Sequence, residues 1–285
     1  MQPAIPIERV ENPAVETLLR DFVRPGRPVI LRGIADRWPA MSRWSPEHLR
    51  ARFPDLKVPV EVAEIDPKIT DPQARLEGTT PVKMTLAAYI DAALGPTPPD
   101  KTYYLAQFPL LERAPELKDD IGSLDAYMDI SSVYPERLKA KLRLPAGLWL
   151  GPAGSLSTLH FDVAQNYLVQ LMGRKRLVLF PPEQSSLLHY PYFGARMPHF
   201  SPVDVEKPDL QRFPRFAHAT PLECTLEPGE ILHIPSGWWH FVRSLEPALS
   251  LNFWWIRPGV LFARREFLLR QVGTLLRKRI FGVVE

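Results

Sequence analysis

Short apolar segments separated by turn signals fill the second half of the chain, and they constrain its fold more than any other feature. The segments lie at residues 167–171, 176–180, 230–235 and 248–255. Turn-forming pairs stand beside them, namely Met172-Gly173, Pro181-Pro182, Pro228-Gly229 and Ser236-Gly237. Short strands with this glycine and proline punctuation are typical of all-β barrels and sandwiches. The sequence therefore predicts a mainly β domain in this half of the chain.

Two histidines and one aspartate among these segments suggest a metal site. His160 and Asp162 form a His-x-Asp motif, and His240 follows Trp239 much later in the chain. Residues i and i+2 of a strand point to the same face, so one strand can aim His160 and Asp162 at one ion. Such a tripeptide is a weak signal by itself, but strand-like segments surround both halves. With His240 on another strand, the three make a facial triad whose open positions suit Fe(II) oxygen chemistry.

Composition narrows the class of protein without pointing to a function. The 285 residues suffice for one large domain or two small ones, and 45% hydrophobic with 24% charged residues is an ordinary soluble balance. No apolar run approaches the ~20 residues of a membrane span, and the first residues lack an apolar signal-peptide core. The single cysteine, Cys224, favours a reducing compartment, so a cytoplasmic location is expected. A net charge of +3 is a weak argument for a nucleic-acid partner.

The first part of the chain, residues 1–144, is expected to be a mixed α/β region packed on a β core at 145–257. Strands are predicted near 27–33, 58–64 and 103–106, and helices after Ser45-Pro46 and over 85–95. The stretch from 112 to 142 is charged, and no element is assigned there.

Residues 258–285 carry leucines at helical spacing with arginines between them, which predicts a C-terminal amphipathic basic helix. Three uses of this helix stay open. It could pack on the core with a solvated face, form a homodimer through residues ~260–281, or contact nucleic acid or an anionic membrane.

Several longer motifs resemble the JmjC (cupin-8) branch of the Fe(II)/2-oxoglutarate oxygenases. They lie at residues 158–167, 173–182, 209–214, 228–235, 238–240 and 252–254. Within that family they resemble the asparaginyl hydroxylase of hypoxia-inducible factor, with the tRNA wybutosine hydroxylase as a second likeness. The resemblance is strong over residues 145–256 and loose before them. It implies a double-stranded β-helix, which is a cupin-like jelly roll.

The resemblance also implies roles for individual residues. His160, Asp162 and His240 match the ligands of Fe(II). Other positions match groups around the cosubstrate 2-oxoglutarate: Lys175 for its distal carboxylate, the hydroxyls of Thr158 and Tyr104, the amides of Asn166 and Asn252, and Trp254 as an aromatic wall. On a continuous strand Thr158 shares the inward face with His160, as the role requires. For Asn252, a place in a structural hydrogen-bond network is as well supported as a contact with the cosubstrate. The adjacent Tyr103 is an alternative to Tyr104 for the hydroxyl at the cosubstrate.

The other histidines and the cysteine are interpreted as structural residues. Five further histidines, His48, His189, His199, His218 and His233, have no ligand-like spacing, and Cys224 reads as a buried small hydrophobe. Leu168 stands where the hypoxia enzyme carries Phe, and Val163-Ala164 replace polar residues beside the triad. These departures alter the substrate side of the pocket, so asparagine hydroxylation does not transfer to this chain.

The leading hypothesis is an enzyme, a 2-oxoglutarate-dependent dioxygenase using Fe(II) and O2. It would hydroxylate a C–H bond of a protein side chain and form succinate and CO2; at an N-methyl carbon the same chemistry appears as demethylation. A tRNA base or a small molecule is the alternative substrate. A non-catalytic metal-binding cupin-like module is one competing class, and the intact triad with Lys175 argues against it. A metal enzyme without the cosubstrate is the other, and in it Lys175 would be incidental.

Overall fold

The computed structural model describes residues 2–64, 80–95, 101–130, 134–189 and 199–257. The predicted C-terminal helix at 258–285, and with it the predicted dimer surface, lies outside these residues. Within the described part of the chain, every helix is too short or too polar to cross a membrane.

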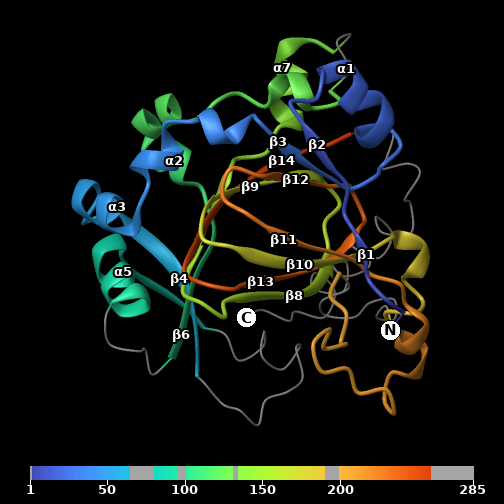
Figure 1. The fold of residues 1–285 in the computed structure, drawn as a ribbon. Coiled ribbons are helices and arrows are strands. Elements are labelled where there is room, and N and C mark those ends of the chain that lie inside the picture. Colours follow the sequence, from blue (N-terminus) through green and yellow to red (C-terminus); the bar gives the residue numbers. More distant parts are fainter. Residues whose placement is uncertain (1, 65–79, 96–100, 131–133, 190–198, 258–285) are drawn as a thin grey trace, which may run out of the picture.

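Two β-sheets face each other in a jelly-roll sandwich, which confirms the predicted fold class (Figure 1). The smaller sheet has the order β1 (Ile5–Pro6), β11 (Leu222–Leu226), β10 (Lys175–Phe180), β13 (Trp239–Ser244), β8 (Leu156–Phe161). The larger has the order β2 (Arg9–Glu11), β3 (Val29–Arg32), β12 (Ile231–Ile234), β9 (Gln165–Met172), β14 (Ala248–Trp255), β7 (Gly147–Gly151), β6 (Lys101–Phe108), β4 (Lys57–Glu64), β5 (Thr80–Thr85).

Alternation along the strands of the smaller sheet separates an inner face from an outer face. On β10, Leu177 and Leu179 pack between the sheets, whereas Val178 and Phe180 join an apolar cluster on the outer face. On β13, Trp239 and Phe241 belong to that same outer cluster. Because side chains of a strand alternate, His240 between them points inward. The pattern that builds the core therefore also aims His240 between the sheets.

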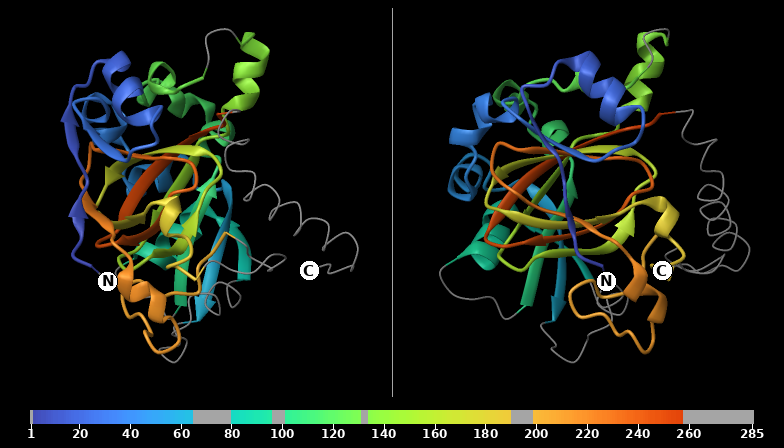
Figure 2. Two further views of the ribbon diagram at one scale, coloured as in Figure 1. Left: turned by 90° about the vertical axis from the view of Figure 1, so that its right-hand side faces the viewer. Right: turned by 45° about the vertical axis from the view of Figure 1, so that its right-hand side comes forward.

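The N-terminal region extends both sheets and covers the larger one with helices (Figure 2). Its strands β2 and β3 join one edge of the larger sheet, and β6, β4 and β5 join the other. The α-helices are α1 (Val15–Leu18), α2 (Ala40–Arg43), α3 (Pro46–Arg52), α5 (Leu86–Leu94), α6 (Leu110–Arg113) and α7 (Glu136–Leu142). A π-helix covers Leu19–Val23. Short 3-10 helices lie at Ala35–Arg37, Pro115–Asp120, Asp125–Tyr127, Pro182–Gln184 and Pro214–His218. One apolar cluster joins α1, α2, α3, α5 and α6 to β7, β9 and β14. The division at residue 144 stays a prediction.

Both predicted helix starts are confirmed, and their caps show why they form there. The Ser45 hydroxyl accepts a hydrogen bond from the backbone N–H of His48 at 3.1 Å, and Pro46 occupies the first turn of α3. Thr85 caps α5 in the same way through the N–H of Ala88, at 3.2 Å. The stretch 112–142, which carries no predicted element, holds α7 and two 3-10 turns. Short elements of one or two turns lack the periodicity that would reveal them in a sequence.

A buried carboxylate fastens the N-terminal strands to the core. Glu230 is only 4% exposed, and it accepts hydrogen bonds from Arg9 at 2.9 Å and from Arg32 at 2.7 Å. Its second oxygen accepts the backbone N–H of Glu227 at 3.0 Å. Burial alone would raise the pKa of Glu230, but the hydrogen bonds from Arg9, Glu227 and Arg32 together lower it. The carboxylate is therefore more favourable charged in the folded protein than in the unfolded chain.

We expect Glu230→Gln to lower the free energy of unfolding by about 1–3 kcal/mol at pH 7, because both arginines are partly exposed and keep some solvation. A folded-state pKa below the unfolded value stabilises the protein above that value and ceases to do so as pH falls. The difference between Glu230→Gln and wild type should therefore shrink below about pH 4. Urea unfolding at pH 7 and at pH 3.5 measures the loss of unfolding free energy and its dependence on pH. The control is Glu246→Gln, because Glu246 forms an exposed ion pair with Arg174. Equal losses in the two variants would contradict the prediction.

Candidate active site

His160, Asp162 and His240 come together between the sheets. His160 on β8 and His240 on β13 are direct cross-strand partners, and Asp162 follows β8 in the turn to β9. Their ligand atoms all lie within 4.8 Å of one another, and His240 Nε2 is 4.0 Å from Asp162 Oδ2. His240 is buried, and the other two side chains are half-buried. Small side-chain rotations suffice to bring all three onto one ion.

A hydrogen bond at Nδ1 orients each imidazole and leaves Nε2 as the atom that can bind a metal. His160 Nδ1 donates to the carbonyl of Thr158 at 2.7 Å, and His240 Nδ1 donates to the carbonyl of Trp238 at 3.0 Å. A carbonyl oxygen only accepts, so each Nδ1 carries the proton and each neutral ring keeps its lone pair on Nε2. Fixing the tautomer through the second ring nitrogen is typical of metal-binding histidines. Both rings are thus prepared as nitrogen ligands.

Burial, followed by the nearby His240, lowers the pKa of His160 to about 4. The ring is therefore neutral at physiological pH, which is the state in which imidazole binds a metal. Asp162 is oriented by a hydrogen bond that the sequence did not indicate. Trp254 Nε1 donates to Asp162 Oδ2 at 3.2 Å, so this tryptophan positions the carboxylate in addition to lining the cavity.

A cavity opens at the triad, and side chains from both sheets line it. Every sequence-predicted site residue except Thr158 is part of the lining: His160, Asp162, His240, Lys175, Tyr104, Asn166, Asn252 and Trp254. Leu168, which the resemblance puts on the substrate side of the pocket, also lines the cavity. Sequence reasoning did not anticipate the other members, which are Gln107, Trp149, Ser157, Ile234 and Val242. The cavity is thus lined by ligand-type and polar groups at one place and by aliphatic and indole groups around them.

Lys175 lines this cavity, and the described residues provide it with no counter-ion. The residue is 2% exposed, and among the described residues no carboxylate pairs with its ammonium. Burial lowers its pKa to about 7. Gly173 has a positive φ and forms the turn that leads into β10. On β10, Lys175 pairs with Ser244 of β13, and its side chain points inward. A bare buried ammonium is costly, so the arrangement favours an anionic ligand that completes the ion pair.

Three polar side chains flank the triad. Asn252 Nδ2 donates to Asn166 Oδ1 at 3.1 Å, and both residues are buried. Whichever way the two amides are turned, at least one N–H and one carbonyl oxygen of the pair remain available. Tyr104 on β6 is within hydrogen-bonding reach of Ser157, and burial raises the pKa of its phenol. The phenol is therefore neutral and able to donate a hydrogen bond.

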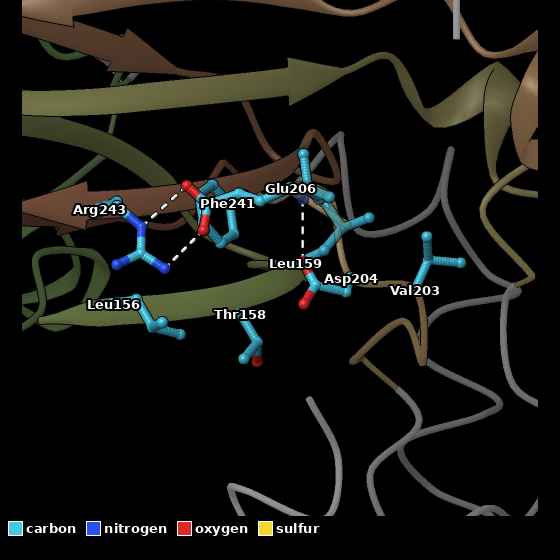
Figure 3. Close-up of a pocket in the computed structure, with 9 residues that line it drawn as sticks. Leu156, Thr158, Leu159, Val203, Asp204, Glu206, Phe241 and Arg243 are labelled. Atoms are coloured by element: carbon cyan, nitrogen blue, oxygen red, sulfur yellow. Dashed lines mark hydrogen bonds and ion pairs between the residues drawn. The ribbon is translucent and has the colours of Figure 1, made fainter. Parts of the chain in front are cut away.

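Thr158 does not reach the cavity, because β8 is not a continuous strand. Across the β8–β13 pair, His160 faces His240 but Ser157 faces Val242, so two residues of β8 stand opposite Phe241 alone. This β-bulge turns Thr158 to the outer face and puts Ser157 inside with His160. Thr158 lines a separate pocket together with Arg243 and Glu206, which form an ion pair (Figure 3). Its Oγ1 is buried without a partner in the described residues.

The remaining histidines contribute no ligand atom to the triad. His233 is buried, with Nδ1 3.1 Å from the carbonyl of Arg27 and Nε2 3.2 Å from Gln165 Oε1. It therefore serves the core, as expected. Burial raises the pKa of the free thiol of Cys224 to about 12, which makes it unreactive.

Comparisons with known proteins agree with this geometry. The family model "Cupin-like domain" (cupin-8) matches residues 15–259. "Lysine-specific demethylase 8" of Danio rerio is 37% identical over 90% of this chain, and the match spans 59% of that protein. "tRNA wybutosine-synthesizing protein 5" of Gallus gallus is 26% identical over 89% of this chain and 78% of its own length. "Bifunctional peptidase and (3S)-lysyl hydroxylase JMJD7" of Homo sapiens is 25% identical over 83% and 79%.

The family match covers the larger part of the chain, including the strands that carry all three candidate ligands and Lys175. The match to the Danio rerio protein extends over nearly all of the chain at a level of identity that indicates common descent. The chain spans about three fifths of the length of that relative. On this basis the chain belongs to the cupin-8 (JmjC) family.

Proposed function

We propose that this protein is an Fe(II)- and 2-oxoglutarate-dependent oxygenase that oxidises a protein side chain. The observation that carries the proposal is the placement of a His-Asp-His ligand set and an unpaired buried lysine in one cavity. Two neutral imidazoles and one carboxylate leave coordination positions open, and the ammonium of Lys175 calls for an anion. A dicarboxylate whose one end chelates a metal satisfies both requirements together.

Each group of the cavity then has a defined task. His160, Asp162 and His240 would hold Fe(II), and Trp254 keeps the carboxylate of Asp162 oriented. Lys175 would pair with the far carboxylate of 2-oxoglutarate, with Tyr104 and Ser157 as neutral hydrogen-bonding partners nearby. The Asn166–Asn252 pair offers a donor and an acceptor beside the metal. Bound Fe(II) with 2-oxoglutarate would supply O2 activation for C–H oxidation; the protein residues supply binding, orientation and shielding from water.

The relatives' names suggest the substrate. Proteins called lysine-specific demethylase and lysyl hydroxylase act on a cationic side chain, so we propose a lysine-like cationic residue of a protein as the substrate. Glu61 on β4, the cross-strand neighbour of Tyr104, has no ion-pair partner among the described residues. Desolvation raises the pKa of this carboxyl. A cationic substrate side chain beside Tyr104 would have this carboxyl group as its ion-pair partner. The relative named for tRNA wybutosine synthesis makes a tRNA base the second candidate.

An anaerobic absorption titration tests the proposal directly. Fe(II) added to the metal-free protein, followed by 2-oxoglutarate, should produce a visible charge-transfer band that needs both additions. The band arises because the keto acid chelates iron through coordination positions that the triad leaves open. Bound iron without such a band would favour a metal-binding module or an enzyme without this cosubstrate.

Product analysis then separates the substrate candidates. Lysine-containing peptides and tRNA are incubated with the loaded enzyme, and mass spectrometry reports gain of one oxygen atom or loss of a methyl group. Two accompanying proposals have separate tests. A cytoplasmic location accords with the free thiol of Cys224, and fractionation of cells tests it. Sedimentation of the chain with and without residues 258–285 tests the predicted homodimer.

A further inference from the structure

The strand that carries His160 needs support from outside its sheet. β8 is the last strand of the smaller sheet, so only β13 pairs with it within that sheet. The bulge at Thr158–Leu159 interrupts even this pairing directly before His160. The carbonyl that holds His160 Nδ1 belongs to Thr158, within the bulge itself. A ligand on a bulged edge strand is less constrained than one in a regular ladder.

A second segment, residues 199–201, runs along the open edge of β8. The N–H of Phe161 donates to the carbonyl of His199 at 3.1 Å, and the N–H of Ser201 donates to the carbonyl of Leu159 at 2.8 Å. These bonds place Phe200 directly opposite His160. Ser201 anchors the segment, because its hydroxyl donates to the carbonyl of Leu188 at 2.7 Å and accepts the N–H of Val203. The edge at the metal site is therefore closed by an anchored strand.

The ring of Phe200 lies against the ligand. Its centroid is 5.2 Å from that of His160, and the planes differ by only 18°, which is a stacked arrangement. The ring of His240 packs on His160 as well, at 4.1 Å and 54°. Rotation of the imidazole about its bond to Cβ would break the stack with Phe200. Phe200 thus restricts a motion that would turn Nε2 away from the cavity.

We propose that Phe200 is a positioning residue for His160, which sets the affinity of the site for its metal. The inference rests on the proposed function, because it assigns His160 to the metal. Phe200 does not line the cavity of the triad, so it acts through the ligand and not on the substrate or cosubstrate. Stacking of this kind contributes enough to change an affinity by about 3- to 10-fold.

The test uses Co(II), whose absorption bands report coordination without O2 or 2-oxoglutarate. The full chain, freed of metal, is titrated as wild type, Phe200→Leu, Phe200→Tyr and Phe213→Leu. Phe213 is the matched control: it lies in the apolar cluster on the outer face of the smaller sheet and contacts the ring of His189 at 4.9 Å, away from the triad. Phe200→Leu should raise the Co(II) dissociation constant about 3- to 10-fold. Phe200→Tyr and Phe213→Leu should stay near wild type.

Thermal melting of each metal-free variant separates positioning from folding. Equal melting temperatures for the two leucine variants with weaker Co(II) binding in Phe200→Leu alone support the proposal. If Phe200→Leu does not fold, Phe200→Met, which fills the space without a ring, takes its place under the same criterion. Unchanged affinity in Phe200→Leu, or in Phe200→Met where it takes its place, or an equal loss in Phe213→Leu, would overturn the inference. A wild-type chain that binds no Co(II) would instead overturn the proposed metal site.

Discussion

Asp162→Ala is expected to abolish substrate-dependent formation of succinate and to remove the charge-transfer band. Asp162 is the only carboxylate of the triad, and alanine leaves two imidazoles that cannot neutralise any charge of Fe(II). Residues that merely orient a ligand cost 10–100-fold in metal affinity or activity when changed. Loss of the ligand itself should exceed about 100-fold. Coupled measurements of succinate and of the anaerobic spectrum test both effects on the same samples.

A graded variant strengthens this experiment. Trp254→Phe keeps the aromatic wall but removes the indole N–H that Asp162 Oδ2 accepts. Iron binding should weaken by about 10–100-fold and the band should persist at higher iron concentration. The rank order wild type, Trp254→Phe, Asp162→Ala is the expected result. Succinate formation by Asp162→Ala at the wild-type rate would remove the triad from the proposal.

Lys175→Met should have two opposite effects. It should abolish binding of 2-oxoglutarate, because the far carboxylate loses its cation. It should also stabilise the ligand-free protein by on the order of 3 kcal/mol at pH 7, since methionine fills similar volume without a buried ammonium. Burial lowers the pKa of Lys175 to about 7 from the ordinary 10.5. Urea unfolding without cosubstrate and a cosubstrate titration monitored by the charge-transfer band measure the two effects.

The pH dependence gives this prediction a second check. Between pH 7 and about 10.5 the unfolded chain holds a proton on Lys175 that the folded protein lacks, so wild-type stability rises with pH across that window. The advantage of Lys175→Met should therefore be largest at or below pH 7 and decline toward pH 10. Arg176→Met is the control, because Arg176 lies next in β10 but pairs with Glu223 and Glu206 outside the cavity. A Lys175→Met protein that is less stable than wild type at pH 7 would contradict the assignment of an unpaired ammonium.

Where the strands alternate strictly, the residues that the family resemblance assigns to the site do line the cavity. His240, Lys175, Asn252 and Trp254 sit on regular strands, and all four line the cavity. Ser157 was missed and Thr158 expected in its place, because a bulge depends on how β8 pairs with β13, which no local pattern records. For the same reason, the sequence did not indicate that Trp254 donates a hydrogen bond to Asp162. Its hydrogen bond to Asp162 spans 92 positions of chain, and only the packing of β14 against the turn after β8 creates it.

Elements of the fold were likewise predictable where their sequence signal is local. Long periodic strands of the core and the capped helices α3 and α5 were predictable, because their signals lie within a few residues. The strands β1 and β2 were not, since they have two and three residues and exist only through pairing. β1 pairs with β11 far along the chain, and β2 pairs in parallel with β3, the next strand in the sequence. Their positions depend on tertiary contacts such as those of Arg9 with Glu230.

The facing positions of His160 and His240 have a consequence beyond chemistry. An ion held by these two rings and Asp162 would clip the edge strand β8 to β13 and to the turn that leads into β9. A ligand that binds only the folded form suppresses opening of the segments it joins. Amide exchange and protease cleavage along this edge would slow in the metal-loaded protein. Cells short of iron would then clear the empty protein faster, so its abundance would follow the supply of its metal.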